Sequence, residues 1–117
     1  MKVEITHHID ASDIDKVGFH EYFYEYDIYV FSDGRDAYIA RSYVDTPTQA
    51  SFLKRVRDSR DYLLRSRDLR DALFVEALTY LRRAGKSDLQ WLTPKTGYVA
   101  VPAEHKSNPL PSGCLPP

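Results

Sequence analysis

The chain has a single cysteine, Cys114, among its 117 residues. One cysteine excludes an internal disulfide framework and a cysteine-based zinc cluster, and it is typical of a protein in a reducing compartment. The five glycines are isolated from one another, so no glycine-rich loop is present to cradle a phosphate group. No run of eighteen apolar residues occurs, and the N-terminal residues do not resemble a signal peptide. We therefore predict a cytoplasmic protein with no membrane span and no cofactor.

Signatures of catalysis and metal binding are also missing. There is no Gly-x-Ser-x-Gly sequence, no cysteine close to a histidine in a structured stretch, and no His-x-x-x-His spacing. The only residues that cluster with metal-ligand chemistry are His7, His8, Asp10 and His20. Because neighbouring residues of a strand point to opposite faces, His7 and His8 cannot easily share one ion. We predict no metal site.

Charge is unevenly distributed along a chain whose formal net charge is only −1. Residues 1–45 contain four basic and ten acidic side chains, whereas residues 46–86 contain ten basic and five acidic ones. A chain of this length is expected to form one domain. The opposite charges of its two segments favour either contact between them or two oppositely charged surfaces for partners.

The most distinctive stretch lies between residues 20 and 45, where two arms rich in Tyr, Phe, Ile and Val flank Asp33-Gly34. Such side chains suit a pleated, half-buried surface. Asp-Gly between two such arms is a strong hairpin signal, since glycine adopts positive φ without steric cost. We predict a β-hairpin with strands Tyr22–Phe31 and Ala37–Val44.

Loop length determines which side chains of this hairpin share a face. A two-residue Asp33-Gly34 turn places Tyr26 opposite Arg41. A three-residue loop, residues 32–34, places Glu25 opposite Arg41, and we prefer it, with Gly34 in a bulge. One face then gathers Tyr22, Tyr24, Tyr26, Ile28, Val30, Tyr38, Ala40, Ser42 and Val44.

Four other segments complete the predicted fold. Lys2–Ile9 alternates apolar and polar residues as a strand does. Thr46, Pro47 and Gln49 form a capping box that predicts a helix over Pro47–Ser59, and an apolar stretch ending at Gly85 predicts a second helix over Asp68–Ala84. A shorter hairpin is expected from Leu89–Thr93 and Tyr98–Val101.

These segments predict an α+β fold in the order β-β-β-α-α-β-β. We expect an antiparallel sheet of three to five strands with two helices packed on one face. The single domain is predicted over residues 1–101. Residues 102–117 contain five prolines and are predicted to form a proline-rich tail.

The function that these features favour is binding to another macromolecule, most often a protein. The second face of the first hairpin strand carries aromatic and acidic side chains, and Tyr and Phe are enriched at interfaces. We therefore expect an inhibitor- or immunity-like protein, or a self-associating dimer, and predict no catalytic residues. The binding residues predicted are Phe23, Glu25, Asp27, Tyr29, Phe31, Arg41, Tyr43, Arg57 and Arg60.

Two alternatives stay open from the sequence. Arginines concentrate between residues 55 and 70, and Arg57 and Arg60 would be the contacts of a nucleic-acid-binding protein. Interleaved aspartates favour local ion pairs on a solvated helix face instead. A small enzyme would use Glu25 and Asp27 as its acid–base pair.

Overall fold

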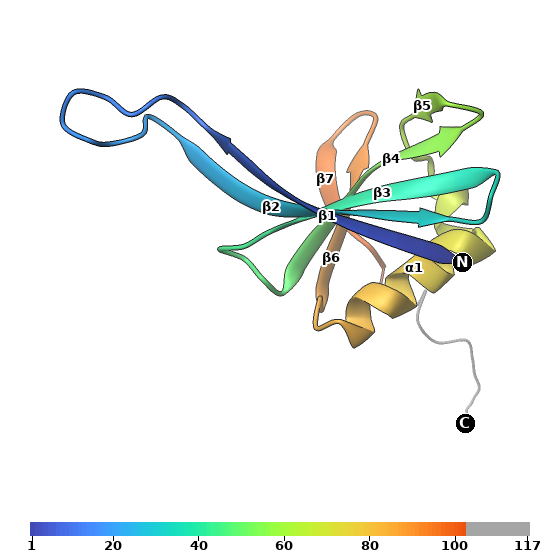
Figure 1. Ribbon diagram of the computed structural model, residues 1–117. Coiled ribbons are helices and arrows are strands. Elements are labelled where there is room, and N and C mark those ends of the chain that lie inside the picture. Colours follow the sequence, from blue (N-terminus) through green and yellow to red (C-terminus); the bar gives the residue numbers. More distant parts are fainter. Residues whose placement is uncertain (103–117) are drawn as a thin grey trace.

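The computed structural model describes residues 1–102, so the predicted proline-rich tail lies outside the described residues except for Pro102. Within these residues the chain forms seven strands, a short 3-10 helix and one α-helix (Figure 1). In chain order they are β1 (Lys2–Ala11), β2 (Phe23–Ser32), β3 (Asp36–Tyr43), β4 (Gln49–Arg57), β5 (Arg60–Tyr62), η1 (Ser66–Arg70), α1 (Ala72–Arg83), β6 (Asp88–Thr93) and β7 (Gly97–Ala100).

All seven strands belong to one mixed sheet with the order β1-β2-β3-β4-β6-β7, and β5 pairs with the C-terminal half of β4. Every pair is antiparallel except β4 with β6, which η1 and α1 connect as a crossover. The predicted α+β class is confirmed. The finer prediction of an antiparallel sheet with three to five strands and two α-helices is wrong.

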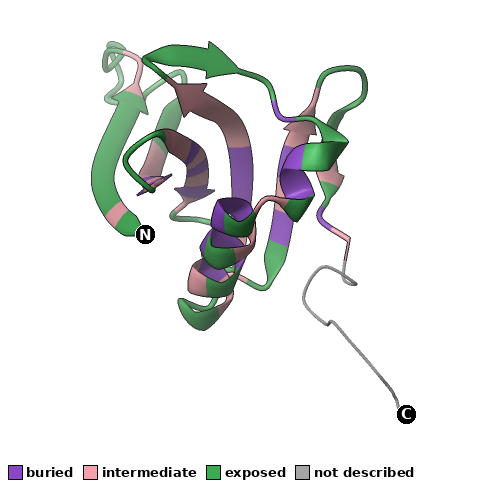
Figure 2. Cartoon of the chain, turned by 90° about the vertical axis from the view of Figure 1, so that its right-hand side faces the viewer, coloured by how far each residue is buried: buried purple, intermediate pink, exposed green. Residues whose placement is uncertain are grey.

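One face of the sheet is covered by α1, and the core lies between them (Figure 2). Phe52 of β4 and Phe74 of α1 are fully buried, with ring centroids 4.5 Å apart. We call this side the helix face and the opposite side the open face. The core consists of Tyr29, Phe31, Tyr38, Ala40, Ala50, Phe52, Leu64, Leu69, Leu73, Phe74, Ala77, Leu78, Leu81, Leu89, Trp91 and Val101.

The predicted central hairpin is present, but its register differs from both alternatives. Ile28 lies opposite Arg41, and the chain reverses at Gly34 and Arg35 between Asp33 and Asp36. The Asp33 carboxylate accepts hydrogen bonds from the backbone N–H groups of Arg35 and Asp36, at 3.0 and 2.8 Å. These bonds stabilise a two-residue Gly34-Arg35 turn in place of the preferred loop over residues 32–34, one position later than the Asp33-Gly34 alternative, with Gly34 at φ +94°.

Relative to the preferred register, with Glu25 opposite Arg41, the pairing is displaced by three residues, and an odd displacement exchanges the side chains that share a face. The odd-numbered residues of β2 pair with the even-numbered residues of β3, so Phe31 faces Tyr38 and Tyr29 faces Ala40. Both pairs are buried beneath α1. The predicted grouping of Tyr26 and Ile28 with Tyr38 and Ala40 is therefore wrong, because burial of the aromatic rings fixes the register.

The predicted helix over Pro47–Ser59 is wrong, since this segment forms β4. Thr46 and Gln49 do interact, but through a turn in which the N–H of Gln49 donates to the carbonyl of Thr46 at 3.0 Å. A register shift opposite Ile39 and Ala40 makes Leu53 an extra residue in β4.

The second predicted helix is confirmed in α1, which begins four residues later than expected and follows η1. Gly85 ends it with φ +90°. The N–H of Lys86 donates to the carbonyl of Leu81 and that of Gly85 to Arg82, at 2.8 and 3.1 Å. This is the glycine-dependent helix end that the sequence predicted.

Beyond the body of the sheet, β1 and β2 continue as a projecting hairpin (Figure 1). We call residues 9–24 the arm. The described molecule measures 63 × 33 × 29 Å along its principal axes. No residue before Tyr29 belongs to the buried core, so the arm adds surface without adding core.

Candidate functional site

The loop at the tip of the arm, residues 12–22, is held by its own polar groups. The Ser12 hydroxyl accepts hydrogen bonds from the N–H groups of Glu21 and Tyr22, at 2.6 and 3.1 Å. The Asp15 carboxylate accepts from the N–H groups of Val17 and Phe19, at 3.0 and 2.9 Å. Short polar side chains that bond the backbone in this way fix a loop without a hydrophobic core.

Large apolar side chains surround this loop and point into solvent. Val17 is 75% exposed and Phe19 is 67% exposed, the two highest values among the large apolar residues. The arm carries four acidic residues and one basic residue, Lys16. It is therefore an apolar and acidic projection. Its exposed large apolar residues are Ile9, Ile14, Val17, Phe19, Tyr22, Phe23 and Tyr24.

Where the arm joins the body, His7 of β1 lies between two carboxylates of β2. Its Nδ1 is 2.7 Å from Asp27 and its Nε2 is 2.7 Å from Glu25. Carboxylates only accept, so both contacts are satisfied when the ring is protonated and donates from both nitrogens. The hydrogen bond to Asp27, followed by that to Glu25, raises the pKa of His7. The three side chains are a third to a half exposed, so they do not form an enclosed catalytic pocket.

On the open face, a row of aromatic rings runs from the arm into the body. Tyr24 lies 5.9 Å from both Tyr22 and Tyr43, and Tyr26 lies 5.6 Å from Tyr43, measured between ring centroids. The guanidinium of Arg41 lies 4.9 Å from the centroid of Tyr43 and 5.9 Å from that of Tyr26. We call these five residues the tyrosine row. Cation–π contact stabilises Arg41 within it.

The sheet curls around its open face, because Arg41 of β3 reaches a residue of β7. Its Nη2 donates to the hydroxyl of Tyr98 at 3.2 Å, although β4 and β6 lie between the two strands. Ser51, the neighbour of Arg41 on β4, is buried. Among the described residues, the Nε of Arg41 is buried without an acceptor.

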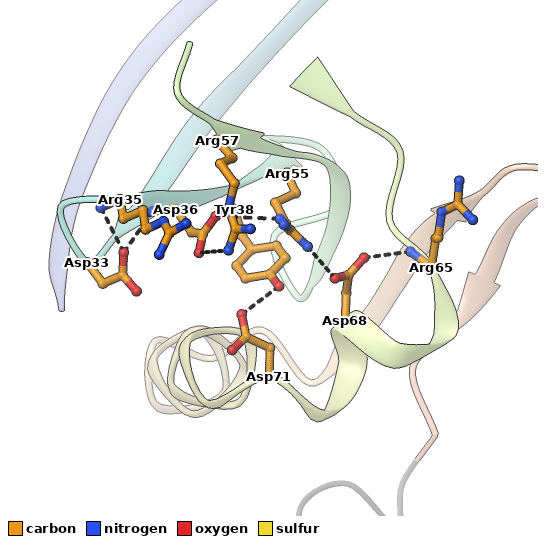
Figure 3. A network of polar contacts seen from close by, with 9 residues as sticks. All are labelled: Asp33, Arg35, Asp36, Tyr38, Arg55, Arg57, Arg65, Asp68 and Asp71. Carbon is orange, nitrogen blue, oxygen red and sulfur yellow. Dashed lines mark hydrogen bonds and ion pairs between the residues drawn. The ribbon is translucent and has the colours of Figure 1, made fainter. Parts of the chain in front are cut away.

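The segment rich in arginine and aspartate, residues 55–71, does not form a solvated helix face. Its side chains connect β3 and β4 to η1 and α1 (Figure 3). Arg57 donates to both carboxylate oxygens of Asp36, at 2.7 and 2.9 Å, and this contact lowers the pKa of Asp36. Arg55 donates to the buried Asp68 at 2.8 Å.

Tyr38 completes this network by donating to Asp71, at the start of α1, at 2.8 Å. Burial, and then the hydrogen bond to Asp71, raises the pKa of Tyr38. The network therefore holds the helix against the sheet. Arg57 is already paired, which weakens its predicted role as a nucleic-acid contact.

The nine predicted binding residues are separated by the fold rather than gathered into one site. Phe23 lies on the arm, half exposed, whereas Tyr29 and Phe31 lie in the core at 6% and 0% exposure. The prediction that Tyr29 and Phe31 form a contact surface is wrong, because α1 covers this part of the helix face. Glu25 and Asp27 hold His7, Arg41 and Tyr43 lie in the tyrosine row, Arg57 bonds Asp36, and Arg60 is exposed on β5.

Sequence reasoning missed the apolar residues of the arm loop. Residues 10–18 contain three aspartates and gave no indication of an apolar surface. The signal that could have revealed the loop is the presence of Ile14, Val17 and Phe19 in a segment too polar and short to bury them. Two open-face contacts were missed as well, because they depend on pairing between strands: His8 stacks on Tyr26 with ring centroids 5.4 Å apart, and Tyr98 bonds Arg41.

Within residues 1–102, no group of three or more histidine, cysteine or acidic side chains is placed to hold a metal ion. In the same part of the chain, no helix has the length and apolar character needed to cross a membrane. No family model matches the chain, and comparison with curated proteins and with solved structures finds no match either.

Proposed function

We propose that this protein is a non-enzymatic, cytoplasmic protein-binding module that inserts its arm into a groove of a partner protein. The observation that supports the proposal is the cluster of exposed apolar side chains on the arm. Single apolar residues are common on protein surfaces, whereas a contiguous apolar cluster is typical of an interaction site. A projecting hairpin of this kind suits an inhibitor- or immunity-like role.

The internal order of the arm loop strengthens this proposal. Hydrogen bonds to Ser12 and Asp15 fix the backbone while Val17 and Phe19 remain exposed. A loop that is already ordered loses less conformational entropy on binding, and therefore binds more tightly for the same contacts. Its aspartates further suggest an apolar groove with a basic rim on the partner.

A photo-crosslinking residue in place of Phe19 tests the proposal in extracts of the native source. We expect a covalent adduct with one protein, identified by mass spectrometry, and no adduct when the same residue replaces Lys95 in the exposed β6–β7 turn. The double variant Val17→Ser/Phe19→Ser should lose that partner. Leu63→Ser, which changes an exposed apolar residue of the body, should retain it. Equal capture by both variants would refute arm binding.

A second candidate function is binding of single-stranded nucleic acid on the tyrosine row. Bases stack on aromatic rings, and the guanidinium of Arg41 places a positive charge against the rings of Tyr26 and Tyr43. Affinity for a labelled oligonucleotide should then fall steeply with salt and fall again in Tyr43→Ala. An affinity that does not depend on salt concentration, or that is unchanged in Tyr43→Ala, would exclude this candidate.

A further inference from the structure

The strand β1 is an edge of the sheet along its whole length. It pairs with β2 over ten consecutive residues without a register shift, and no other strand of residues 1–102 pairs with it. All of its residues are exposed except Val3 and Ala11, which are partly buried. An edge strand offers a row of unpaired N–H and C=O groups, which proteins usually protect with proline, bulges or inward-pointing charges. Within residues 2–11, β1 has no proline and no bulge.

We infer that two copies of this chain pair through their β1 edges, antiparallel and related by a two-fold axis at Thr6. The inference goes beyond the proposed arm function and uses the edge of β1, which shares Ile9, Asp10 and Ala11 with the arm but not the loop at its tip. A strand added to a free edge gains main-chain hydrogen bonds, while side-chain complementarity determines its register. The side chains of β1 are complementary to themselves, which is why we propose a second copy as the partner.

Geometry limits the registers that such a pair can adopt. Only every second residue of an edge strand directs its N–H and C=O groups outward. A two-fold axis between identical antiparallel strands therefore passes through a residue position, and opposed residues are both even or both odd in number. The three central choices place the axis at Ile5, Thr6 or His7.

Charge distinguishes these three registers. An axis at Ile5 places Lys2 opposite His8, and an axis at His7 places Glu4 opposite Asp10. An axis at Thr6 places Lys2 opposite Asp10 and Glu4 opposite His8, each pair occurring twice. Lys2 with Asp10 joins opposite charges, Glu4 with Asp10 opposes like charges, and an axis at Ile5 gives Lys2 no acidic partner, so Thr6 is favoured.

The apolar side chains agree with this register. On the helix face, an axis at Thr6 places Val3 of one copy opposite Ile9 of the other, where Ile9 is 61% exposed in the single chain. Val3 packs against the core. Beside it, Met1, Val75 and Tyr80 line a groove along α1. Ile9 of the second copy would lie next to this groove, and both copies would bury apolar surface.

Charge reversal tests the contact. Wild type should sediment as a dimer in analytical ultracentrifugation, and Lys2→Glu or Asp10→Lys alone should weaken dimerisation about tenfold or more. The double variant Lys2→Glu/Asp10→Lys should restore it, and the control Lys95→Glu in the β6–β7 turn should not change it. A monomer at every concentration, a larger assembly, or a dimer insensitive to these changes would overturn the inference.

Cysteine crosslinking tests the register itself. In a Cys114→Ser background, Thr6→Cys should form a symmetric disulfide on mild oxidation, because the two positions face each other across the axis. Ile5→Cys and His7→Cys should each crosslink poorly. A mixture of Glu4→Cys with His8→Cys chains should form heterodimers. Crosslinking of Ile5→Cys or His7→Cys in preference to Thr6→Cys would refute the register. The arm variant Val17→Ser/Phe19→Ser should still dimerise, so failure of the dimer and failure of the arm function are distinguishable.

Discussion

At the scale of single residues, β2 shows how position along one strand changes the role of a side chain. Phe23 and Phe31 lie on the same face of β2, yet Phe23 is 50% exposed and Phe31 is fully buried. The difference arises because α1 covers the C-terminal half of the strand and not the arm. Residue type alone therefore could not separate a core aromatic from a surface aromatic.

Replacing Phe31 with alanine should destabilise the fold by about 3–5 kcal/mol, because a buried ring is lost from a cluster with Phe52 and Tyr80. Phe19→Ala, at an exposed site of the arm, should change the free energy of unfolding by no more than about 0.5 kcal/mol. Urea unfolding followed by circular dichroism compares the two. Equal midpoints would contradict the burial described for Phe31.

The pair of carboxylates around His7 predicts a pH-dependent contribution to stability. Hydrogen bonds to Asp27 and Glu25 raise the pKa of His7 in the folded state above its ordinary value of 6.5. The stabilisation is therefore complete below pH 6.5 and is lost as pH rises through the folded-state pKa. Relative to wild type, His7→Gln should be least stable in acid and should approach it in alkaline solution, in urea titrations at several pH values. A difference that does not change with pH would exclude this role.

At the scale of elements, the helix predicted from the sequence over Pro47–Ser59 was wrong, and the structure shows why. The extra residue Leu53 in β4 places Phe52 and Arg55 on the same face although they are three apart in the chain. That spacing is typical of a helix, and the capping box at Thr46 also predicted a helix. The strand prevails because Phe52 packs against residues of β2 and α1, far along the chain.

The turn between β4 and β5 offers a test at this scale. Asp58 and Ser59 have φ of +52° and +65°, and no other non-glycine residue of the described chain has positive φ. Asn-Gly is the pair that such a hairpin turn prefers. Asp58→Asn/Ser59→Gly should therefore raise the free energy of unfolding by about 1 kcal/mol. Ser87→Gly, at a negative φ, should lower it or leave it unchanged, and thermal unfolding compares both with wild type.

At the scale of the whole molecule, the arm does not share the hydrophobic core that stabilises the body. The Cα radius of gyration is 16.7 Å, whereas a compact chain of this size has about 13 Å. The arm accounts for the elongation, since it projects from the body and contributes no core residue. Selection for stability alone would not require such a projection, which agrees with its proposed role in binding.

Shortening the arm should leave the body folded. Asp10 and Tyr24 are opposite one another in the ladder, so an Asn-Gly turn can join them in place of residues 11–23. We expect the midpoint of urea unfolding to stay close to that of wild type and the photo-crosslinked partner to be lost. A strongly destabilised body would show that the arm contributes to folding.

The sequence by itself determined the α+β class, the strands β1, β2, β3, β6 and β7, and α1 with its end at Gly85. These depend on local signals: alternation, helical periodicity and the conformational freedom of glycine. The position of the turn at Gly34 was nearly correct from the same kind of signal.

Only the tertiary structure decided the register of the central hairpin, the strand character of β4 and the parallel pairing of β4 with β6. It also decided which aromatic rings are buried and which form the arm and the tyrosine row. Each of these depends on contacts between residues far apart in the chain, whose burial outweighs local preferences of about 1 kcal/mol or less. For that reason the predicted site residues were distributed over the core, the arm and the open face.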